Sequence, residues 1–98
     1  MIVHVVMIRF KEHAEKETTV RRAKELIDAL MGRVPSLRSM ETGINFSPEA
    51  RAMDLVLTAT FEDRRGLEEY AVHPEHLKVI EWLKEVAEYS KVVDYERL

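Results

Sequence analysis

The residues best suited to acid–base chemistry lie in one short stretch, residues 70–76 (Tyr-Ala-Val-His-Pro-Glu-His). An imidazole with a pKa of about 6.5 can exchange protons at neutral pH. A tyrosine hydroxyl can donate a hydrogen bond to a developing oxyanion. Pro74 suits the first position of a helix, where the missing N–H costs nothing. His76 therefore falls in the first turn of a predicted helix.

His76 is predicted to face the interior of the protein. The apolar positions that follow it recur with the period of a helix, and the resulting stripe contains His76, Ile80, Leu83 and Ala87. A polar ring on a buried face needs either a hydrogen-bond partner or a chemical role. The first interpretation is a buried structural histidine that ties its helix to the rest of the fold. The second is a general acid or base.

Two other histidines are weaker candidates. His4 shares a strand face with Ile2 and Val6, where a single histidine is usually a core residue, and its convergence with His76 on one cavity stays open. His73 precedes a proline and should be extended at the helix entry, where it either caps the first turn or lines a ligand pocket. No sequence spacing is typical of a metal site, and three glycines cannot form a phosphate-binding loop. We expect neither a metal nor a cofactor.

Composition describes a single globular domain over residues 1–98, with 46% hydrophobic residues, 34% charged residues and a net charge of −3. Basic residues are scattered, which argues against a nucleic-acid partner. No apolar run reaches membrane-spanning length, so we expect no membrane partner and a cytoplasmic location. The absence of cysteine excludes a disulfide framework and a thiol nucleophile.

The elements that must position these residues follow from periodicity. Residues 2–10 alternate and are rich in β-branched side chains, with His4 among the apolar residues of one face. The predicted order is β-α-β-β-α-β, which is the ferredoxin-like split β-α-β arrangement with a four-stranded antiparallel sheet, in the α+β class. Strands are expected at 2–10, 37–46, 52–62 and 89–96, helices at 18–33 and 74–88, and a helical turn at 66–70.

Two helices can cover only one face of such a sheet. The other face carries several apolar positions, so it needs a cover, and a second copy of the chain supplies one. We therefore expect a homodimer in which two sheets pack face to face into a barrel-like core.

An ordered set of motifs resembles the stress-responsive A/B barrel domain, a dimeric α/β-barrel family often called Dabb. The resemblance covers essentially the whole chain and implies the same dimeric ferredoxin-like barrel. The matching pieces are Val3-His4-Val5-Val6-Met7, Pro35, Gly43-Ile44-Asn45-Phe46-Ser47, Asp54-Leu55-Val56-Leu57, Phe61, Tyr70-x-x-His73-Pro74-x-His76 and Val92-Val93-Asp94-Tyr95.

One branch of that family is a plant polyketide cyclase that performs an intramolecular aldol condensation without a cofactor. The resemblance implies that His76 is the acid/base histidine and that Tyr70 is its supporting tyrosine. It also places His4 in the site and implies that Asp94, on the last strand, orients His76. Helix 18–33 lacks the aromatic residues that a long polyketide pocket would need.

Three functions therefore stay open. The first is a homodimeric stress-responsive barrel protein with a small pocket for a small hydrophobic or aromatic molecule. The second is a cofactor-independent enzyme, similar to a cyclase or a monooxygenase, that uses His76. The third is a purely structural dimer with a filled interior. An internal pocket lined by His4, Tyr70 and His76 would distinguish them.

Overall fold

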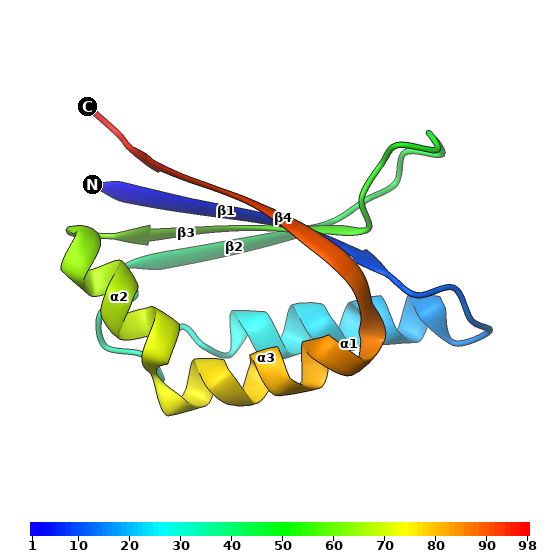
Figure 1. The fold of residues 1–98 in the computed structure, drawn as a ribbon, viewed down its shortest axis with the longest axis horizontal. Coiled ribbons are helices and arrows are strands. Elements are labelled where there is room, and N and C mark those ends of the chain that lie inside the picture. Colours follow the sequence, from blue (N-terminus) through cyan, green and yellow to red (C-terminus); the bar gives the residue numbers. More distant parts are fainter.

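The computed structural model describes residues 1–98 and confirms the predicted topology. A four-stranded antiparallel sheet has the strand order β2-β3-β1-β4, and all helices lie on one side of it (Figure 1). The segment expected to be a short turn is a full helix, α2. The elements are β1 (Ile2–Phe10), α1 (Lys16–Asp28), β2 (Ser39–Ile44), β3 (Leu55–Phe61), α2 (Arg64–Val72), α3 (Pro74–Val86) and β4 (Ala87–Glu96).

The first helix ends five residues earlier than its apolar period predicts. After Asp28 the chain tightens into turns, in which the N–H of Met31 donates to the carbonyl of Asp28 and the N–H of Arg33 to that of Leu30. Such i→i+3 bonds commonly close a helix. Gly32 then takes φ of 95°, a conformation that costs glycine little. The apolar period continues through Leu30 and Val34 because both side chains pack into the core from these turns.

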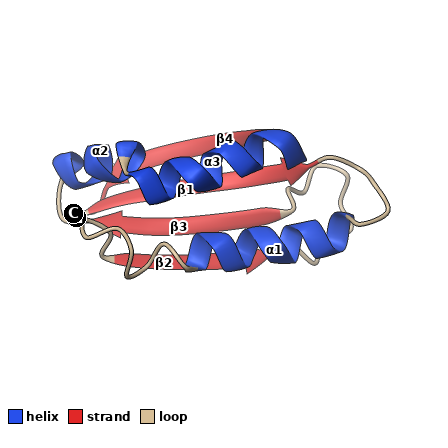
Figure 2. Ribbon diagram, turned by 90° about the horizontal axis from the view of Figure 1, so that it is seen from below, coloured by secondary structure: helices blue, strands red, loops and turns tan.

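The core lies between the helices and one face of the sheet. Figure 2 shows α1 running along β2 and β3, whereas α2 and α3 run along β1 and β4. The alternation predicted for β1 and β3 holds, because the inward residues of β3 are buried and those of β1 are buried or, at His4 and Val6, half-buried. The largest fully buried side chains of this core are Phe10, Phe61, Ile27, Leu30 and Leu55.

The opposite face of the sheet has no helix over it, and we call it the open face (Figure 1). Cross-strand pairing places Val5, Thr58 and Val93 side by side on it. Several of its apolar side chains are exposed, including Met7, Val56, Val93 and Tyr95. An apolar sheet surface of this kind marks an interaction site. None of the helices has the length and hydrophobicity that crossing a bilayer requires.

Candidate functional site

A cavity of about 550 Å³ lies on the helix-covered side of the sheet, between α3 and strands β1 and β4. Its walls are mainly aliphatic. The inward stripe predicted for α3 borders this space, and its residues are only half-buried. The single buried residue of the helix is Val79. The stripe therefore faces inward as predicted, and it lines a cavity.

Three polar side chains from three elements converge at this cavity: His4 from β1, Tyr70 from α2 and His76 from α3. The ring centroids of Tyr70 and His76 are 4.1 Å apart, and those of His4 and Tyr70 are 6.1 Å apart. Tyr70 also packs on Phe61 at 5.2 Å, which holds its ring against the core. We call these three side chains the polar end of the cavity. The convergence of His4 and His76, which the sequence left open, is present.

His76 is oriented by a backbone carbonyl. Its Nδ1 lies 3.2 Å from the oxygen of Ala71, and because a carbonyl only accepts, Nδ1 carries the proton. Burial lowers the pKa of His76, and the neighbouring His4 and His73 lower it further against the opposing effect of the Ala71 carbonyl. The ring is therefore neutral at pH 7, and its Nε2 is an acceptor without a partner in the protein.

Tyr70 presents a protonated hydroxyl beside this imidazole. The residue is 2% exposed, and burial raises the pKa of its phenol to about 12. The hydroxyl makes no hydrogen bond within the protein. Every fully buried polar side-chain atom has a hydrogen-bond partner, so this hydroxyl is not fully buried. The hydroxyl must therefore border the cavity, where it can donate to a bound molecule.

The predicted contact between Asp94 and His76 is wrong. Asp94 instead binds Nδ1 of His4 through its Oδ1 atom. The cause is the strand register, in which His4 on β1 and Asp94 on β4 lie directly opposite each other. Asp94 orients the first-strand histidine, and the contact that holds His76 comes from α2.

The prediction that His73 lines the pocket is also wrong. His73 is the residue between α2 and α3, and its Nδ1 accepts a hydrogen bond of 3.1 Å from the N–H of Glu75. This contact caps α3, with Pro74 in the first turn as expected. His73 is therefore structural, and it is absent from the cavity wall.

Sequence reasoning missed the side of the cavity formed where α3 runs into β4. Lys84, Glu88 and Ser90 line it there, together with Val92. Lys84 and Glu88 resemble ordinary surface charges in the sequence, so no signal identified them. The alternation of β4 could have identified Val92, because it pairs with the inward-facing Val6. No group of three or more His, Asp or Glu side chains is arranged to hold a metal ion.

Comparison with known proteins gives one family and many related structures. The model of the Stress responsive A/B Barrel Domain family, Dabb, matches residues 2–97. No curated protein matches the sequence at a significant level.

Three solved structures illustrate the structural likeness. A dimeric protein of unknown function with a ferredoxin-like fold from Bacteroides fragilis is 29% identical, with a TM-score of 0.87 over 98% of this chain and 95% of that one. A Dabb family protein from Mesorhizobium loti is 20% identical, with a TM-score of 0.78 over 99% and 96%. A hydroxynitrile lyase from Passiflora edulis is 16% identical, with a TM-score of 0.75 over 96% and 90%. The last two likenesses concern the fold alone.

Proposed function

This chain belongs to the stress responsive A/B barrel domain family, and we propose that it is a homodimeric member whose cavity binds a small hydrophobic or aromatic molecule. One observation carries the proposal, namely that three polar side chains meet at one end of a mainly aliphatic cavity of about 550 Å³. Ligand sites of 300–1,000 Å³, roughly, combine apolar walls with a few placed polar groups in this way. A purely structural dimer with a filled interior has less support, because such an interior would not hold a cavity of this size.

The homodimer has two lines of support. The open face carries exposed apolar side chains that one protomer leaves in water. The related structure from Bacteroides fragilis is described as dimeric. An isologous contact between two open faces would cover both surfaces at once. Equilibrium sedimentation tests it, and a concentration-independent monomer at micromolar protein would contradict it.

Ligand binding is tested by thermal shift with a panel of small phenols and phenyl ketones. A probe at ten times its Kd should stabilise the protein by ~1.4 kcal/mol, which raises Tm by roughly 6–11 °C. Val92→Trp should abolish the shift, since Val92 lines the cavity from an exposed strand that can accept a larger side chain. Val72→Trp is the matched control, because Val72 is 70% exposed on α2. Equal shifts in both variants, or no shift with any probe, would contradict the proposal.

A second candidate function is cofactor-independent acid–base catalysis, and the protonation of the polar end favours it. Neutral His76 leaves Nε2 free to accept a proton, while the Tyr70 hydroxyl stays protonated as a donor. In such a reaction Nε2 would take the proton from carbon next to a carbonyl, and Tyr70 would stabilise the oxyanion that forms. The same proton would then return to the intermediate or to a leaving group. The related hydroxynitrile lyase shares the fold and adds nothing on the reaction.

Deuterium exchange at the α-carbon of a bound ketone tests this second function by NMR. Removing the base in His76→Ala should slow exchange by about 10²-fold or more, and Tyr70→Phe should slow it less. The exposed His13 gives the matched control His13→Ala, which should exchange like the wild type. The rate should also rise as pH increases through the lowered pKa of His76, because only the neutral ring accepts a proton. Unchanged exchange in His76→Ala would leave ligand binding without catalysis.

A further inference from the structure

The connection between β2 and β3 is built as a projecting arm. Residues 45–54, which we call the arm, rise from the end of the sheet on the side that the helices leave open (Figure 1). Phe46, near the start of the arm, is 99% exposed, and Ile44 just before it is 43% exposed. A fully exposed phenylalanine gains nothing within its own protomer, which indicates that its contacts lie elsewhere.

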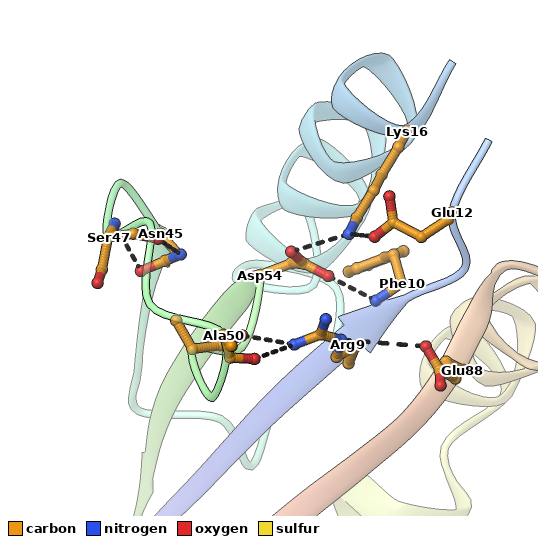
Figure 3. Close-up of polar contacts among 10 residues, drawn as sticks. Arg9, Phe10, Glu12, Lys16, Asn45, Ser47, Ala50, Asp54 and Glu88 are labelled. Carbon is orange, nitrogen blue, oxygen red and sulfur yellow. Dashed lines mark hydrogen bonds and ion pairs between the residues drawn. The ribbon is translucent and has the colours of Figure 1, made fainter. Parts of the chain in front are cut away.

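The arm is nevertheless held in place by hydrogen bonds to the body of the protein (Figure 3). The Arg9 guanidinium donates to the carbonyl of Ala50 at 3.1 Å and to that of Ala52 at 3.0 Å. At the end of the arm, the Asp54 carboxylate accepts a hydrogen bond of 2.7 Å from the N–H of Phe10. These contacts tie both the middle and the end of the arm to β1.

The start of the arm is ordered by a local turn around Phe46. The Asn45 side chain accepts from the N–H of Ser47 at 3.0 Å and donates to the carbonyl of Ser47 at 2.9 Å. Asn45 thus closes a turn that brackets Phe46 on both sides. An aromatic side chain presented by an ordered loop loses little entropy when it binds, which is the usual property of an interface anchor.

Charge on the open face specifies how a second copy would lie on it. Glu41 of β2 shares the open face with Thr58 and Val5, and Lys91 of β4 shares it with Met7. Both charged side chains are exposed, and neither forms an ion pair within the protomer. They therefore place opposite charges on the two edge strands of one face.

Two arrangements of a face-to-face dimer can be compared on this basis. A two-fold axis parallel to the strands sets β2 of each copy beside β4 of the other. Glu41 is then level with Val93 of the second copy and two residues along the strand from its Lys91, so two such pairs of unlike charge form. An axis across the strands sets β2 over β2 and opposes Glu41 with Glu41. Attraction between unlike charges favours the first arrangement. It also keeps corresponding strand ends together, because rotation about the strand direction does not exchange them.

In the favoured arrangement the arm meets the beginning of β4 in the second copy. The arm leaves the sheet next to Ile44 and Leu55, and the strand register aligns Leu55 with Ile8 and Ile8 with Ser90. Tyr89 precedes Ser90 and is 43% exposed. The register opposes Tyr89 with Arg9 and Lys91 with Met7, which places both residues on the open face, and the Lys91 ammonium lies 5.6 Å from the centre of the Tyr89 ring. Tyr89 also borders the cavity at the edge of the sheet.

We propose that the arm clasps the second copy, with Phe46 packed on Tyr89 and Glu41 paired with Lys91 across the interface. This clasp rests on the proposed homodimer and adds the residues that hold it. It makes the arm, which one protomer alone leaves in water, a specific part of the interface.

The clasp is tested by measuring the dimer dissociation constant by sedimentation velocity over a dilution series. Phe46→Ser should raise Kd at least tenfold, whereas Val72→Ser, an exposed apolar change on α2, should leave it unchanged. In a double-mutant cycle, Phe46→Ala and Tyr89→Ala should each raise Kd, and the double variant should be no weaker than Phe46→Ala alone. Additive losses in that cycle would overturn the contact between Phe46 and Tyr89.

The charge arrangement has its own test in the same assay. Glu41→Lys and Lys91→Glu should each weaken the dimer about tenfold or more, and the double swap should restore the wild-type Kd. A double swap as weak as the single variants would overturn the arrangement of β2 beside β4. A monomeric wild type would overturn the homodimer itself, whereas a stable dimer indifferent to Phe46→Ser would overturn the clasp alone.

Discussion

The two halves of the layer beneath the sheet are built from similar helices and pack in different ways. Helices α1 and α3 each have 13 residues and an apolar stripe with the helical period. In α1 the stripe is buried at Val20, Ala23 and Ile27, whereas in α3 only Val79 is buried. The α1 half is closely packed, with Ile27 and Leu30 bordering the cavity from that side, and the α3 half is hollow. An amphipathic stripe therefore predicts which face turns inward without predicting what that face meets.

The difference arises from the strands that the two helices cover. β3, near α1, lies between two other strands and presents the buried side chains of Leu55, Leu57 and Phe61. β4, near α3, is an edge strand whose residues after Ala87 are all exposed. The side chains of β4 do not fill the space below it, so the cavity remains. We infer that the α1 half supplies stability and that the α3 half is available to a ligand.

The largest expected contrast is between Ile27→Ala and Ile80→Ala. Ile27 borders the cavity from α1 and is only 1% exposed, so its truncation should cost about 3–4 kcal/mol in the free energy of unfolding. Ile80 is half-buried beside an existing cavity, and its truncation should cost about 1 kcal/mol or less. Urea denaturation at one fixed protein concentration measures both values. Equal costs would show that the α3 half is as well packed as the α1 half.

A second contrast compares two hydroxyl groups, one at the cavity and one buried on the open face of the sheet. The Tyr70 hydroxyl has no partner in the protein, so Tyr70→Phe should leave the free energy of unfolding nearly unchanged. The same change should weaken the binding of an oxygen-bearing probe by about tenfold. The Thr60 hydroxyl is buried and bonded to that of Ser39, so Thr60→Val should cost about 1 kcal/mol and leave the probe unaffected. Calorimetric titration and urea denaturation measure the two effects. A stability loss in Tyr70→Phe with unchanged affinity would assign Tyr70 a structural role only.

A smaller effect is expected in the pH dependence of stability. Because burial lowers the pKa of His76, the folded state binds this proton less tightly than the unfolded state does. The free energy of unfolding should therefore fall as pH drops from the unfolded value of about 6.5 towards the lower folded pKa. Between pH 7.5 and 5, Tm should decrease more in the wild type than in His76→Gln. Parallel pH profiles for the two proteins would show that His76 is not shielded in the cavity.

The smallest expected effect is that of Asp94→Asn. Its pair with His4 lies partly in solvent, with 44% of the Asp94 side chain exposed, so the loss of the charge should cost about 0–1 kcal/mol. The titration midpoint of His76, followed by NMR, should not move, because Ala71 and not Asp94 holds that ring. A clear shift of the His76 midpoint would restore the pairing that the sequence suggested.

The sequence by itself determined the elements, their order and the family. Alternation in residues 2–10 predicted β1 with its full extent, because a strand covered on one side must present its apolar side chains with a period of two. Pro74 located the start of α3, because its ring forbids a preceding helical turn and suits a first one. The extent of α2 was missed, because Asp63 caps it through the N–H of Gly66, a contact that periodicity does not record.

Only the tertiary structure decided which polar groups meet. Asp94 and His4 are 90 positions apart, and a register shift of one residue would have turned Asp94 to the other face of the sheet. The break between α2 and α3 at His73 brings the Ala71 carbonyl, five positions earlier, to His76. Local periodicity assigns a face to each side chain, whereas strand register and the angle between helices decide which side chains share a cavity.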